Sequence, residues 1–140
     1  MKTRAVIDTN VLFAGYRSKS PTSPNIRLLE RWQAGHFTWL YSRDTLGEYA
    51  RKLIELGIDP PLVRSFLALL VVAGEETPIM IFHERHYPDD PDDIAFLLCA
   101  VNGRAGYLVS YDRHLTSLDG FYDFRICPPV EFLTCLERQG

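Results

Sequence analysis

Residues 5–13 read AVIDTNVLF, an apolar run, a short polar turn and a second apolar run. The run from Ala5 to Ile7 is typical of a buried strand, and the residues after Asn10 suit a helix. A strand that turns directly into a helix forms the first half of a βα unit. Asp8 stands at the turn, where it could cap the helix or could project a carboxylate beyond the end of the strand.

The rest of the chain alternates short apolar strands with helices. Further strands are predicted at residues 36–42, 77–82, 107–110 and 124–128. Helices are predicted at residues 10–16, 24–34, 43–56, 60–73, 94–103 and 128–139. This order implies βα units around a mostly parallel sheet of about five strands with helices on both faces, an α/β sandwich. The 140 residues fit a single domain, 1–140.

The composition is that of an ordinary globular protein, with 46% hydrophobic and 24% charged residues. A formal charge of −3 argues against a protein held to nucleic acid by a general basic field. No apolar run approaches the ~18 residues that span a membrane, and the N-terminus has too short an apolar core for a signal peptide. The three cysteines, an odd number without CxxC spacing, indicate buried free thiols in a reducing cytoplasm.

Acidic residues stand where several predicted strands end. Asp8 follows the first strand, Asp112 follows the strand at 107–110, and a group of aspartates follows the strand at 77–82: Asp89, Asp90, Asp92 and Asp93. Because the loops after parallel strands gather at one edge of a sheet, these carboxylates are expected to converge there. Like charges at close range repel, so a bound cation is the simplest compensation, and oxygen ligands favour Mg²⁺ or Mn²⁺ over Zn²⁺.

Each acid also has a plainer interpretation when it is taken alone. Asp8 or Asn10 can cap a helix, and Asp112 can be a turn residue. Asp92 and Asp93 suit the first turn of a helix, where the helix dipole favours acids. Only the joint placement of these residues favours a metal site.

Two other polar features are less directly informative. Glu48 lies on the polar side of the helix predicted at 43–56, so periodicity alone predicts a solvated surface acid. His83 and His86 in the sequence HERH lack HExxH spacing, and no cysteine stands at zinc-ligand spacing. Structural or solvent-facing roles are therefore favoured for these histidines over metal binding.

Four segments, taken in order, resemble the PIN-domain nucleases. They are DTNV at 8–11, DTLGEYARKL at 44–53, DPDDIAFLLCA at 90–100 and LVSYDRHL at 108–115. The resemblance covers essentially the whole chain and is greatest to the toxin components of VapC-like toxin–antitoxin pairs. It implies a PIN-like three-layer sandwich and a ribonuclease that uses one or two Mg²⁺ or Mn²⁺ ions for metal-assisted hydrolysis of a phosphodiester bond.

The resemblance implies metal-binding and catalytic roles for four acids: Asp8, Glu48, Asp93 and Asp112. The run of aspartates leaves the third metal ligand open, since Asp90 or Asp92 could serve instead of Asp93 or beside it. The assignment of Glu48 rests on the resemblance alone, because the hydrophobic pattern of its helix points the other way.

Supporting roles follow for residues that flank these acids. Thr9 and Asn10 would hold the turn after Asp8, and Ser110 keeps the hydroxyl of the threonine that is common in the family at this position. Arg113 could steady the scissile phosphate, or could equally be a surface cation that screens the acids.

The expected partners are an RNA substrate and a cognate antitoxin protein that offers a cation to the acidic groove. A homodimer is a further expectation. Trp39, Tyr41 and Phe66 could belong to a dimer face, although core packing is the favoured interpretation of these aromatics. Two alternatives stay open: a stand-alone RNA-processing nuclease, and a non-catalytic PIN-like module that binds RNA or protein without cutting.

Overall fold

The computed structural model describes residues 2–139, which contain one sheet of five parallel strands. The strands are β1 (Thr3–Ile7), β2 (Phe37–Tyr41), β3 (Glu75–Glu76), β4 (Tyr107–Val109) and β5 (Arg125–Cys127), in the order β3-β2-β1-β4-β5. The first strand therefore lies at the centre, and the chain continues outward in both directions. The predicted α/β fold with a parallel five-stranded sheet is confirmed.

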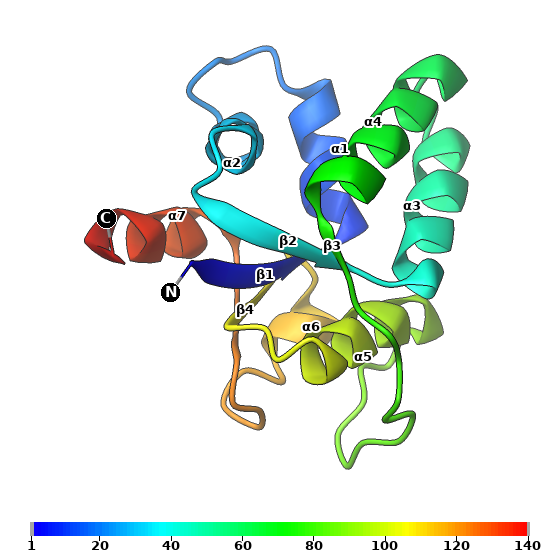
Figure 1. The fold of residues 1–140 in the computed structure, drawn as a ribbon, viewed down its shortest axis with the longest axis vertical. Helices are drawn as coiled ribbons and strands as arrows, with labels where there is room; N and C mark the ends of the chain where they lie inside the picture. The colour runs from blue at the N-terminus through cyan, green and yellow to red at the C-terminus, as the bar shows by residue number, and fades with distance from the viewer. Residues whose placement is uncertain (1, 140) are drawn as a thin grey trace.

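Helices cover both faces of this sheet. They are α1 (Thr9–Arg17), α2 (Pro24–Gln33), α3 (Arg43–Glu55), α4 (Pro60–Ala73), the 3₁₀ turn η1 (Pro91–Asp93), α5 (Ile94–Asn102), α6 (Arg113–Thr116) and α7 (Pro129–Gln139). Figure 1 shows α1 to α4 on one side of β1 and β2 and α5 on the other, which gives three layers. Between residues 2 and 139, no helix combines the length and the apolar character needed to cross a membrane.

Local sequence signals begin and end the helices close to where the pattern predicted. Ser42 starts α3 through a capping box with Thr45, in which each side chain bonds the backbone N–H of the other residue. Ser23 caps α2, and proline occupies its first position. Gly57 follows α3 with a φ of 91°, a left-handed conformation that glycine adopts without strain. The capping box at Ser42 and the turn at Gly57 together fix the length of α3, the helix that carries Glu48.

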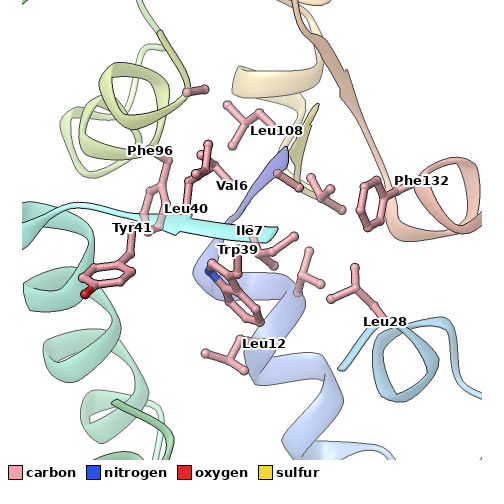
Figure 2. Close-up of a cluster of buried hydrophobic side chains, with 14 of the residues drawn as sticks. Val6, Ile7, Leu12, Leu28, Trp39, Leu40, Tyr41, Phe96, Leu108 and Phe132 are labelled. Carbon is pink, nitrogen blue, oxygen red and sulfur yellow. The ribbon is translucent and has the colours of Figure 1, made fainter. Parts of the chain in front are cut away.

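The core lies on both faces of the sheet, as Figure 2 shows. Trp39 of β2 lies with Leu12 of α1 on one face, whereas the next residue, Leu40, lies with Phe96 of α5 on the other. All four of these side chains are buried. Successive strand residues point to opposite faces, so a strand covered on both sides needs apolar residues at every position. This explains why three successive residues of β2, Trp39, Leu40 and Tyr41, are all hydrophobic and buried.

The aromatic residues considered above for a dimer face are part of this core. Trp39, Tyr41 and Phe66 are each no more than 5% exposed. The rings of Trp39 and Phe66 lie 5.4 Å apart, and that of Tyr49 lies 5.8 Å from Phe66. The core-packing interpretation is confirmed, and these side chains are not available to a partner.

The prediction of a strand at residues 77–82 is wrong. The strand β3 is only Glu75–Glu76, and its pairing ends with a bond from Thr77 N to Tyr41 O at 2.7 Å. Pro78 has no N–H to donate, and β2 stops at Tyr41, so the sheet offers no partner beyond this point. The segment that follows is held instead by a side chain, that of Asn102.

The cysteines form no disulfide. Cys99 and Cys127 are buried free thiols, as predicted, whereas Cys135 on α7 is partly exposed. Burial raises the pKa of both buried thiols to about 12, so they are protonated and unreactive at neutral pH.

Candidate metal centre

A pocket of about 270 Å³ lies beyond the carboxyl ends of the two central strands. Because β1 and β4 pair in register, with Ile7 opposite Val109, both strands end at the same level. The loops that follow them bring Asp8 and Asp112 to the same opening. Six acids in all line the pocket: Asp8, Glu48, Asp90, Asp92, Asp93 and Asp112. All four predicted ligands and both alternatives to Asp93 thus meet at one place.

Asp8 both caps a helix and faces this pocket. Its Oδ1 accepts a hydrogen bond from Thr9 N at 2.7 Å, and its Oδ2 accepts one from the Ser110 hydroxyl at 2.6 Å. Asp8 is only 4% exposed, and this burial raises the pKa of its carboxyl group to about 6. The two hydrogen bonds oppose that shift, while the charges of Asp112 and Asp90 add to it. The two interpretations of Asp8 are therefore compatible.

Three acids form a compact group at the centre of the pocket. Asp90, Asp93 and Asp112 each offer one carboxylate oxygen, and the three oxygens lie within 4.8 Å of one another. Asp93 is buried, and its Oδ2 has no hydrogen-bond partner in the described chain. Burial, followed by the charge of Asp8 and by the adjoining Asp112, raises the pKa of Asp93 to about 8. Asp90 rather than Asp92 is thus the close companion of Asp93.

The aspartate run does not leave a strand directly, contrary to the prediction. It follows the loop after Thr77 and opens η1, where Asp90 Oδ1 accepts a hydrogen bond from Asp92 N at 3.0 Å. The 3₁₀ turn leads straight into α5, and Asp93 is the residue that joins the two. Only two of the three predicted strand exits are therefore real, and the buried helix α5 positions the third acidic group.

Glu48 reaches the pocket from α3. Its side chain is 22% exposed, less than expected for the solvated acid that periodicity predicts. Its Oε2 accepts from Arg51 at 2.7 Å, and the same guanidinium lies 3.2 Å from Asp92 and 3.1 Å from Glu55. Glu48 does not belong to the close group of three aspartates. Its role as a ligand stays a prediction.

The predicted supporting residues are divided between the pocket and the surface. Thr9 is buried at the pocket wall, and its hydroxyl has no hydrogen-bond partner among residues 2–139. Asn10 Oδ1 accepts from Tyr111 N at 3.4 Å, which ties the two strand-end loops together. Arg113 begins α6 and is exposed, and it is not among the residues that line the pocket.

Three residues of α3 near Glu48 were not identified from the sequence as part of this region. Tyr49 is fully buried and donates from its hydroxyl to the carbonyl of Ile7, the residue before Asp8. Arg51 pairs with Glu48, and Lys52 lines the pocket. The spacing from Glu48 could have identified the last two, because residues three and four apart share a helix face.

The geometry suits a hard divalent cation. The group offers only carboxylate oxygens, the ligand type that Mg²⁺ and Mn²⁺ prefer. A buried carboxylate oxygen without a partner is costly, and a cation would satisfy it. Among residues 2–139, no other three His, Cys, Asp or Glu side chains meet in this way, so the histidines of HERH build no rival site.

Comparison with known proteins agrees with this site. A family model described as PIN domain matches residues 4–114, a span that contains all six acids of the pocket. A search of the curated proteins gives no significant match. PIN domains are generally metal-dependent nucleases, and the acid group found here is of the kind that binds a metal. With a match over most of its length, this chain belongs to the PIN domain family.

Proposed function

We propose that this protein is a metal-dependent endoribonuclease that hydrolyses phosphodiester bonds in RNA. The observation that carries the proposal is the meeting of Asp90, Asp93 and Asp112, which each offer one oxygen within 4.8 Å of the others, together with a buried Asp93 oxygen that has no hydrogen-bond partner among residues 2–139. A structural cluster of acids would be expected to pair with bases. Here no Lys, Arg or His of residues 2–139 lies within 4.0 Å of the carboxylates of Asp90, Asp93 and Asp112, and burial, followed by the neighbouring acids, raises the pKa of Asp93.

Asp8, Glu48, Asp93 and Asp112 are the proposed metal-binding and catalytic acids, with Asp90 beside Asp93. Bound Mg²⁺ or Mn²⁺, as one or two ions, would supply Lewis acidity toward the phosphate and lower the pKa of a water molecule. The protein's own part is to hold the carboxylates in place before substrate arrives. The bond from Ser110 to Asp8 and the link from Asn10 to Tyr111 fix the two strand-end loops relative to each other.

The test is cleavage of a fluorescent single-stranded RNA in Mn²⁺ and in EDTA. Asp112→Asn should lower the rate by more than about 100-fold, because it removes a proposed ligand from the group. Asp44→Asn is a matched control, since Asp44 is an exposed acid in the first turn of α3 that does not line the pocket. Cleavage that survives both EDTA and Asp112→Asn would exclude this proposal.

We further propose that the protein is the toxin of a toxin–antitoxin pair and acts in the cytoplasm. The resemblance of the four motifs to VapC-like toxins supports this, as does a groove of six acids that would suit an arginine of an antitoxin. The test is size exclusion of this chain with the product of the neighbouring upstream reading frame, in EDTA. A stable complex is expected. The absence of any complex would favour the stand-alone nuclease.

A further inference from the structure

Six residues that line the metal pocket carry no carboxylate. Three of them come from α1 and from α3 and its C-terminal end: Phe13, Lys52 and Leu56. The two helices pack against each other, and the three residues line the same pocket as the carboxylates. Metal binding requires neither an ammonium group nor apolar side chains. These three residues therefore need another explanation.

Lys52 is the only basic residue among the described residues that line the pocket. It stands one helical turn after Glu48, the usual spacing for an ion pair. The carboxylate of Glu48 is instead bonded to Arg51, and Lys52 has no carboxylate within 4.0 Å among residues 2–139. The ammonium group is thus free to bind a negatively charged group of a ligand.

Phe13 and Leu56 are apolar residues that line the same pocket as Lys52. Leu56 is 44% exposed, and Phe13 is only partly buried against the core. The guanidinium of Arg17 lies 5.5 Å from the centre of the Phe13 ring, over its face. Aromatic rings with neighbouring cations are the surfaces on which single-stranded nucleic acids stack their bases.

We propose that Lys52, Phe13 and Leu56 form a nucleotide subsite beside the metal centre, which binds the phosphate and the base next to the scissile bond. Lys52 contacts that phosphate, and the Phe13 ring with Leu56 receives the base. The proposal rests on the proposed nuclease function and adds to it the residues that hold the neighbouring nucleotide. In a duplex the bases are stacked and paired, so they could not reach a ring at the wall of a 270 Å³ pocket.

The test is the binding of a fluorescent six-nucleotide single-stranded RNA, measured by anisotropy at several salt concentrations. Ca²⁺ replaces Mn²⁺ so that the carboxylates are neutralised and the RNA stays intact. Lys52→Met should weaken binding about five- to tenfold. It should also reduce the slope of log affinity against log salt by about 0.7, the contribution of one phosphate contact in a single strand.

Two further variants separate the parts of the subsite. Phe13→Leu keeps an apolar side chain but removes the ring, so it should weaken binding several-fold without changing the salt slope. Lys52→Arg should restore both affinity and slope. Lys2→Met is the matched control, because Lys2 precedes the start of β1 and lies about 20 Å from Asp8, the first residue of the pocket, by the strand rise of about 3.3 Å per residue.

The possible results distinguish the two proposals. If Lys52→Met binds RNA with the affinity and salt slope of the wild type, or if the wild type binds no RNA at all, the subsite is wrong. If the wild type binds RNA through Lys52 but does not cleave it in Mn²⁺, the subsite stands and the nuclease proposal fails. If Lys2→Met has the same effect as Lys52→Met, a general loss of charge explains the data and the subsite is again excluded.

Discussion

The Ser110 hydroxyl donates to Asp8 Oδ2 at 2.6 Å and accepts from Asp112 N at 2.9 Å. One fully buried side chain thus joins the carboxylate at the end of β1 to the backbone of the loop after β4. The bond also lowers the pKa of Asp8, against the effect of burial. The two strand-end acids are therefore positioned relative to each other before any ligand binds.

Ser110→Ala should weaken both the fold and the site. It leaves Asp8 Oδ2 and Asp112 N without this partner, and a buried polar group that loses its partner costs about 1–3 kcal/mol. Urea denaturation in EDTA measures the free energy of unfolding, and cleavage assays measure activity. Ser117→Ala, at an exposed serine after α6, is the control and should change neither quantity. Unchanged stability in Ser110→Ala would mean that water replaces the hydroxyl at no cost.

The pH dependence of stability should report the raised pKa of Asp93. Without metal, the folded protein holds a proton on this group up to about pH 8, whereas the unfolded chain loses it near 3.8. Between these values the folded state binds more protons than the unfolded state, so Asp93 makes stability fall as pH rises toward about 8. Above that pH its contribution is constant.

Melting temperatures measured across this pH range in EDTA test the sign. Asp93→Asn should fall less steeply with pH than the wild type, because the titrating group is gone while the shape is kept. In Mn²⁺ the wild type should gain more stability at pH 8 than at pH 6, since a metal competes with protons for carboxylates. Parallel pH profiles of wild type and Asp93→Asn in EDTA would show that Asp93 is already ionised in the folded protein.

Glu48 and Glu55 provide a matched comparison, because both pair with Arg51 on the same helix. Glu48 lines the pocket, whereas Glu55 is 53% exposed and does not. Glu48→Gln should lower cleavage strongly, by about 10- to 100-fold, and raise the Mn²⁺ concentration needed for half-maximal activity. Glu55→Gln should leave both unchanged. If both substitutions have negligible effects, Glu48 is not a metal ligand and the site consists of aspartates alone.

The parts of the fold that local signals determine were predictable from the sequence. Ser42, Ser23 and Gly57 mark helix ends through bonds and angles that involve only near neighbours. The convergence of Asp8 and Asp112 was also predictable, because two parallel strands that end in acids share one edge of a sheet. The position of Glu48 was not, because its helix pattern says only which side faces the core. Which way that polar side turns depends on how α3 packs against α1.

The loop before the aspartate run shows the opposite case, in which a local pattern misleads. Residues 77–82 have the apolar character of a strand, yet Met80 is 79% exposed and Phe82 is 61% exposed. Pro78 ends the pairing, and the bonds that hold the segment come from Asn102, about twenty residues away in the sequence. No rule based on neighbouring residues could have found that contact.

Asn102 should therefore control the order of this loop and, through it, the approach to Asp90. Its Oδ1 accepts from the N–H groups of Met80 at 2.8 Å and Ile81 at 2.7 Å, and its Nδ2 donates to the carbonyl of Ile81 at 2.9 Å. Asn102→Ala removes all three bonds from an exposed segment, so the loop should open locally while the core stays folded. Hydrogen exchange at the Met80 and Ile81 amides should speed up. Trypsin should cut faster after the exposed Arg85, with little change in melting temperature.

Asn102→Asp keeps the acceptor oxygen and should protect the two amides better than Asn102→Ala does. If exchange at these amides is the same in Asn102→Ala and the wild type, the loop is held by other contacts.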